Sequence, residues 1–157
     1  MTRRAPGRAN ESEPVIDIGA ALDLLAAAVE QQGVDFVYKP KWMDERTYLI
    51  HRYANRGAPD CIVGQALALA NLDVRELAVI SDGGVRKLYL EGKLPVALTL
   101  GAMAVFDAAE RSQDRGCRLG DVLAHATAAA VKFLDLLPDS AFATAKHAVC
   151  GVSPRSA

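Results

Sequence analysis

The hydrophobic positions of this chain recur mostly at intervals of three and four residues, the spacing of one face of an α-helix. The longest such stretch covers residues 120–137. Two others cover residues 17–32 and residues 99–115, the second opening on Thr99 as an N-cap and followed by Gly116. The pattern therefore predicts three long helices that pack through their apolar faces.

A fourth helix is predicted in the segment YANRGAPDCIVGQALALA, residues 53–70. Pro59 marks a turn, and Asp60 fits the N-cap position of a helix that begins at Cys61. Gly64 and the neighbouring alanines are small, so other elements can approach this helix closely. We expect the rest of the chain to pack around it.

An alternating pattern predicts two β-strands before that turn. Residues 34–38 and 47–53 are rich in β-branched and aromatic side chains, and a polar loop separates them. Two shorter helical segments follow at residues 73–80 and 85–91. The predicted fold class is α+β, mainly α, a small helical domain of about four to six helices with one antiparallel β-hairpin.

The length of 157 residues favours a single globular domain, which we place at residues 15–138. Residues 1–14 are polar and predict a disordered arm, while residues 139–157 predict a partly disordered tail. The arm lacks the apolar segment of a signal peptide, and no run approaches the roughly 20 apolar residues that cross a bilayer. We expect a cytoplasmic protein with no membrane association.

The composition narrows the classes of function. The formal net charge is −1, which predicts no general attraction to nucleic acid, although a local basic patch stays open. The three cysteines, Cys61, Cys117 and Cys150, are widely spaced and form no CxxC pair. This spacing argues against a disulfide framework and a zinc site, so we expect free thiols, no metal and no cofactor.

Several short motifs resemble a family of uncharacterised small proteins from actinobacteria and their phages, recognised by a Cys-x-x-Gly helix start. The matching segments are residues 33–38, 57–67, 99–102, 108–109, 113–116 and 119–120. The family pattern has a tryptophan where this chain has Leu119. The resemblance implies a phage or actinobacterial origin, with the host cytoplasm as the location for a phage protein. It implies no activity.

Cys61 is the sharpest candidate for catalysis. A thiol in the first turn of a helix lies at the positive end of the helix dipole, which lowers its pKa. His51 lies on the predicted strand before it, and Asp60, Asn55 or Asp35 are the candidates for a third polar group. This set predicts a cysteine-dependent hydrolase. The alternative is that Cys61 is a small core residue of an apolar helix.

A second hypothesis is a DNA-binding regulator. Residues 73–95 have the general appearance of a helix-turn-helix, in which Arg86, Lys87 and Lys93 would face phosphates. The turn at residues 81–84 is longer and richer in glycine than such a unit requires.

The interpretation that we favour is a non-enzymatic accessory or regulatory protein acting through protein contacts. The first predicted strand and the loop after it gather residue types that are enriched at protein interfaces. These candidates for partner binding are Tyr38, Lys41, Trp42, Met43 and Arg46. The alanine-rich final helix is apolar over a wide arc, which also makes a homodimer plausible.

Overall fold

The computed structural model describes residues 15–38, 53–55, 57–80 and 83–137, and all structural statements below concern these residues. They contain six helices and four short strands. The helices are α1 (Ile18–Gln32), α2 (Ile62–Leu69), α3 (Val74–Val79), α4 (Val85–Leu90), α5 (Leu100–Asp114) and α6 (Leu119–Asp135). The strands are β1 (Val15–Ile16), β2 (Ala54–Asn55), β3 (Ala58–Pro59) and β4 (Ala97–Leu98).

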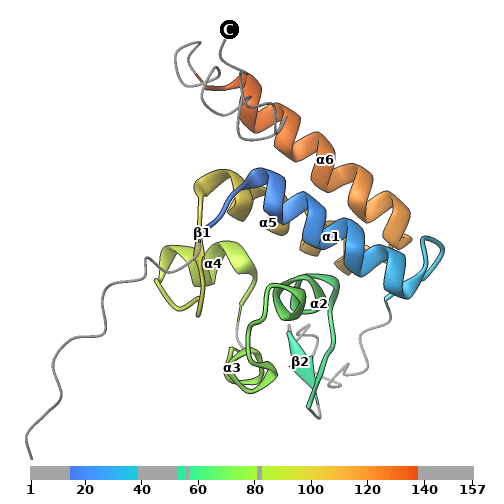
Figure 1. Cartoon of the computed structure of the whole chain (residues 1–157). Coiled ribbons are helices and arrows are strands. Elements are labelled where there is room, and N and C mark those ends of the chain that lie inside the picture. The colour runs from blue at the N-terminus through green and yellow to red at the C-terminus, as the bar shows by residue number, and fades with distance from the viewer. Residues whose placement is uncertain (1–14, 39–52, 56, 81–82, 138–157) are drawn as a thin grey trace, which may run out of the picture.

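The three long helices α1, α5 and α6 pack against one another, and α2 lies against α1 and α5 on the side away from α6 (Figure 1). The short helix α4 packs on α5, and α3 lies beside β2 and β3. The predicted fold class, α+β and mainly α, is confirmed. The fully buried side chains come from all six helices, so the described residues share one core.

The predicted helix ends agree closely with the structure. The Asp17 carboxylate accepts the Ala20 N–H at 2.8 Å and caps α1, which Gly33 ends with a positive φ of 94°. The Thr99 hydroxyl accepts the Ala102 N–H at 3.2 Å and caps α5. These caps are local, since each side chain satisfies an N–H group within its own first turn.

The predicted antiparallel hairpin is wrong. Residues 34–38 form no strand and make only an isolated bridge from Val37 to Arg118. The sheet beside α1 is instead a parallel pair, in which Val15 of β1 lies opposite Ala97 of β4. The described part also holds a two-residue antiparallel pair, β2 with β3. Residues 47–52, most of the second predicted strand, lie outside the described residues.

The start of α6 explains why residues 34–38 are not a strand. The backbone N–H groups of Leu119 and Gly120 donate to the carbonyls of Phe36 and Val34, at 2.9 and 2.8 Å. The N-cap residue Arg118 offers no side-chain hydrogen bond to the helix. The carbonyls that a strand would give to a neighbouring strand therefore satisfy the first turn of α6.

The N-cap of α2 is Cys61 and not Asp60, which corrects the prediction by one residue. The Asp60 N–H donates to the Tyr53 carbonyl at 3.0 Å, so Asp60 still belongs to the extended chain that follows β3. The chain becomes helical only after Cys61, whose sulfur accepts the Gly64 N–H at 3.3 Å.

Two buried polar side chains of α5 hold the ends of two other helices. The Glu110 carboxylate, 2% exposed, accepts the Tyr53 hydroxyl at 2.5 Å and the Val85 N–H at the start of α4 at 2.7 Å. The Gln113 side-chain oxygen accepts the Ile62 N–H at the start of α2, also at 2.7 Å. Helix α5 therefore fixes both α2 and α4 by hydrogen bonds as well as by packing.

None of the helices in the described ranges combines the length and the apolar character that a membrane span requires.

Gly64 should be indispensable for this fold. A Cβ atom there would lie 2.0 Å from the Tyr53 carbonyl oxygen, and backbone cannot give way as a flexible side chain can. We expect Gly64→Ala to lower the free energy of unfolding by about 3 kcal/mol or more. Gly19→Ala, where the Cβ would meet its nearest neighbour at 3.5 Å, is the control and should be neutral or stabilising by less than about 1 kcal/mol. Equal urea midpoints for the two variants would contradict this packing.

Tyr53 should make the protein sensitive to high pH. Burial, and then the charge of Glu110 and the hydrogen bond to it, raise the pKa of Tyr53 well above its ordinary value. The unfolded chain releases the tyrosine proton near pH ~10 while the folded chain keeps it, so stability falls as pH rises past that value. Urea unfolding above pH ~10 should show that the free energy of unfolding falls more steeply with pH in the wild type than in Tyr53→Phe. Equal slopes of the free energy of unfolding against pH in the two proteins would contradict the prediction.

Candidate functional site

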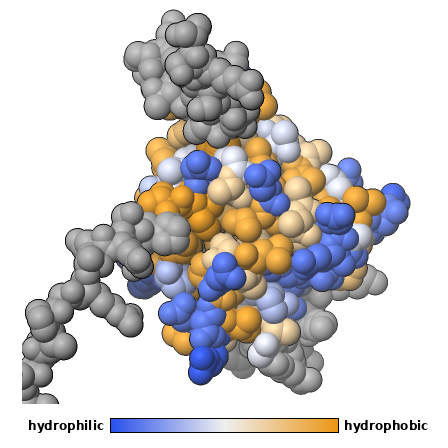
Figure 2. All heavy atoms as spheres, viewed as in Figure 1, coloured by the Kyte–Doolittle hydropathy of each residue, from blue (hydrophilic) through white to orange (hydrophobic). Residues whose placement is uncertain are grey.

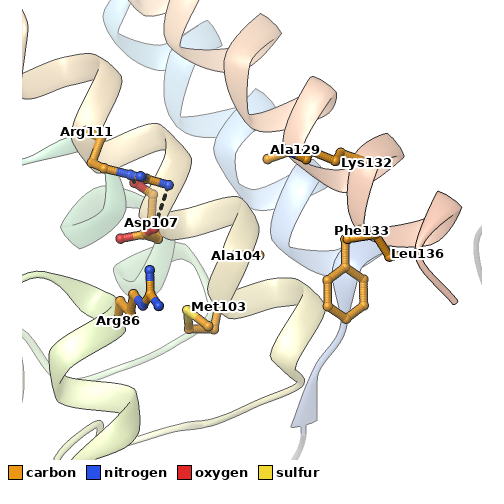
Figure 3. A pocket seen from close by; sticks show the side chains of 9 residues that line it. All are labelled: Arg86, Met103, Ala104, Asp107, Arg111, Ala129, Lys132, Phe133 and Leu136. Atoms are coloured by element: carbon orange, nitrogen blue, oxygen red, sulfur yellow. Dashed lines mark hydrogen bonds and ion pairs between the residues drawn. The ribbon is translucent and has the colours of Figure 1, made fainter.

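The candidate site is a groove of about 240 Å³ between α4, α5 and α6, which we call the α5–α6 groove (Figure 3). Its apolar lining comes from both long helices, with Met103 and Ala104 on α5 facing Ala129 and Phe133 on α6. Leu136, just after α6, also lines the groove. The volume is below the range of about 300–1,000 Å³ of drug-sized ligand sites, so the groove suits a few side chains of a partner.

The charged residues of the α5–α6 groove are mostly basic. Arg111 pairs with Asp107 one helical turn before it, at 2.8 Å, so these two charges neutralise each other. Arg86 on α4 and Lys132 on α6 stand on opposite walls, and neither makes an ion pair within the described ranges (Figure 3). Within the described residues, the groove therefore presents two positive charges without an ion-pair partner on either side of an apolar floor.

Large apolar side chains are exposed at the same end of the molecule. Leu136 is 75% exposed, and Leu100 at the start of α5 is 52% exposed. These two helix ends are neighbours, because a Cβ atom on Gly101 would come within 3.0 Å of the Phe133 ring. Figure 2 shows hydrophobic and hydrophilic residues interspersed over the viewed face. Large apolar side chains exposed on neighbouring helix ends are compatible with an interaction surface.

The surroundings of Cys61 favour a structural role for its thiol. Cys61 is 1% exposed, and its sulfur caps α2 by accepting the Gly64 N–H. The Ile62 N–H, a further donor in the same turn, is already bound to Gln113. Oxyanion stabilisation at a helix start depends on such N–H groups being available to substrate.

Among the described candidates for the third polar group of the hydrolase, only Asp60, the preceding residue in the chain, is placed beside Cys61. Asp35 pairs with Arg118 at the start of α6, at 3.3 Å. The backbone N–H of Asp60 donates to the Tyr53 carbonyl just before α2 begins. His51 lies outside the described residues, and Asn55 lies on β2. The hydrolase stays a prediction, and the described geometry adds no support to it.

Tyr38 is the one residue of the predicted partner-binding set that the structure describes. It is half-buried, and its pKa is raised by burial first and then by the charges of Asp60 and Cys61. Its hydroxyl therefore lies near the start of α2. Lys41, Trp42, Met43 and Arg46 lie outside the described residues.

The three cations of the predicted DNA-binding unit lie on and after α4. Arg86 lines the α5–α6 groove, and Lys93 pairs with Glu91 at 2.7 Å. Lys87 is exposed on α4 and packs toward Gly83. Helices α3 and α4 have six residues each, which is short for a helix that reads the major groove. The DNA-binding hypothesis stays a prediction.

Sequence reasoning missed the groove because its residues come from three separate helices. Met103, Asp107 and Arg111 recur at intervals of four in the sequence, so the spacing alone places them on one face of the predicted helix. Nothing in the sequence pairs that face with Lys132 or Leu136. In the part of the chain that the structure describes, no group of three histidine, cysteine or acidic residues could hold a metal ion.

Comparisons with protein-family models, with curated proteins and with solved structures gave no match to this chain.

The thiol of Cys61 should be protected in the folded protein. We expect iodoacetamide to label the partly exposed Cys117 at least about a hundredfold faster than Cys61, because Cys61 reacts only when the core opens. Peptide mass spectrometry after timed labelling measures both rates in one sample. Rapid labelling of Cys61 at neutral pH in the folded protein would contradict a structural thiol and would support the hydrolase.

Proposed function

We propose that this protein is a non-enzymatic accessory or regulatory factor that acts by binding another protein at the α5–α6 groove. The observation that carries the proposal is the combination, at one end of the molecule, of a small apolar groove and exposed large apolar side chains. Leu136 belongs to both, since it lines the groove and is 75% exposed.

The chemistry of the groove supports binding more than catalysis. Its single carboxylate, Asp107, is held by Arg111, and its other lining residues are apolar or basic. General acid–base or nucleophilic catalysis needs a positioned group that can exchange a proton or attack a substrate. A small apolar floor with cations on its walls is instead the kind of surface that receives an anchoring side chain.

The biological setting that we propose comes from the sequence. The similarity to small actinobacterial and actinophage proteins supports a phage or actinobacterial factor. Within the described residues, Cys61 and Cys117 form no disulfide, which is consistent with a reducing cytoplasm. A second copy of this chain is the alternative partner for the same apolar surface.

Leu136→Asp tests the proposed interface. Tagged wild type, Leu136→Asp and Val79→Asp are used as baits in an actinobacterial lysate. Val79 on α3 is 82% exposed, so its variant is a control for placing a charge on an exposed apolar residue elsewhere. We expect a protein that the wild type and Val79→Asp retain, and that Leu136→Asp loses by at least about tenfold, because a buried unpaired carboxylate opposes binding.

Retention of the same proteins by all three baits would contradict the interface. Thermal unfolding by circular dichroism checks that each bait is folded, and both substitutions are at exposed positions where stability changes little.

A further inference from the structure

We propose that the α5–α6 groove binds a short acidic protein segment, which inserts one large apolar side chain between carboxylates that pair with Arg86 and Lys132. This inference rests on the proposed function and adds the chemistry of the partner.

The apolar floor of the groove suits one large apolar side chain of a partner, which we call the anchor. Met103 is 8% exposed and lies at the base of the groove, and Phe133 lies across from it on α6 (Figure 3). A volume of about 240 Å³ is too small for a whole helix, although it accommodates a leucine or an aromatic side chain projecting from one. Deep apolar pockets that hold one such anchor carry much of the binding energy of protein interfaces.

The positive charges of the groove favour acidic residues on both sides of the anchor in the partner. Arg86 and Lys132 project from different helices on opposite sides of the floor (Figure 3). Asp107 does not compensate them, because it already pairs with Arg111. A partner with carboxylates on both sides of its apolar anchor would neutralise both cations, and a basic partner would be repelled by them.

Nucleic acid fits this surface less well than an acidic peptide. Polyanion binding relies on many basic contacts with phosphates, whereas the described part of this groove offers two cations without an ion-pair partner, in a chain with a formal net charge of −1. The apolar floor between the cations has no counterpart in a phosphate backbone.

The chain's own terminal segments lack the required charge. Residues 1–14 and residues 138–157 each contain more basic than acidic side chains. Segments of that sign do not complement Arg86 and Lys132. The charge pattern therefore indicates a separate acidic partner.

Peptide display on the full-length chain tests the inference. A random-peptide library is selected on the wild type, and enriched peptides are synthesised for fluorescence anisotropy. We expect the enriched peptides to share one large apolar residue with acidic residues on both sides, and to bind more weakly as salt rises. The double variant Arg86→Glu, Lys132→Glu should weaken binding by about tenfold or more, the loss of two partly exposed charge pairs together with new repulsion.

The matched control is Arg75→Glu, Lys93→Glu, which changes the net charge equally at exposed cations that pair with Asp73 and Glu91 outside the groove. It should alter affinity by less than about twofold, because long-range charge effects are weak at physiological salt.

Other outcomes separate the two proposals. Peptides that Leu136→Asp loses and the Arg86→Glu, Lys132→Glu variant keeps would overturn the acidic partner and leave the protein interface standing. A synthetic peptide of residues 138–157 that binds in the groove would make the chain's own tail the occupant. A dimer in sedimentation velocity that Leu136→Asp abolishes would make a second copy the occupant. Either of these would overturn the inference, and peptides that are indifferent to Leu136→Asp would overturn both proposals.

Discussion

The buried carboxylate of Glu110 is the interaction on which the arrangement of the short elements depends. It lies on α5 inside the core, where it accepts the Tyr53 hydroxyl and the first N–H of α4. A buried carboxylate is costly unless it is well hydrogen-bonded, and leaving one of its donors unpaired costs about 1–3 kcal/mol. The same tyrosine gives its backbone carbonyl to Asp60 and lies against Gly64. One residue pair thereby positions the chain before α2, the start of α2 and the start of α4.

Helix α5 performs two tasks with different residues. Glu110 and Gln113 point into the core and bind the N-terminal ends of α4 and α2. Met103 and Asp107 line the α5–α6 groove on a surface that α4 and α6 also border. Glu110 fixes the start of α4. It therefore also sets the position of Arg86, the second residue of α4, in the groove. The proposed binding surface therefore depends on the buried network although it shares no residue with it.

The buried polar groups near the helix starts have a structural role in this chain. Cys61, Glu110 and Gln113 are almost fully buried, and each accepts a backbone N–H at the start of a helix. Such groups resemble a catalytic set in composition, since a thiol, a carboxylate and an amide are all buried in the core. Their hydrogen bonds, however, are made to the fold itself. The accessible chemistry lies in the groove, where apolar and basic side chains favour binding.

The sequence by itself determined the helices, because helical periodicity and caps such as Asp17 and Thr99 are local properties of the chain. It also indicated the close approach at Gly64, since a small residue in an apolar helix permits one. Tertiary structure alone decided the conformation of residues 34–38, where two carbonyls accept hydrogen bonds from the start of α6. The β-propensity of this segment does not specify which partner its carbonyls bind. It likewise decided the burial of Glu110 and the assembly of the groove. Both bring together residues from separate helices, and no spacing within one helix encodes that meeting.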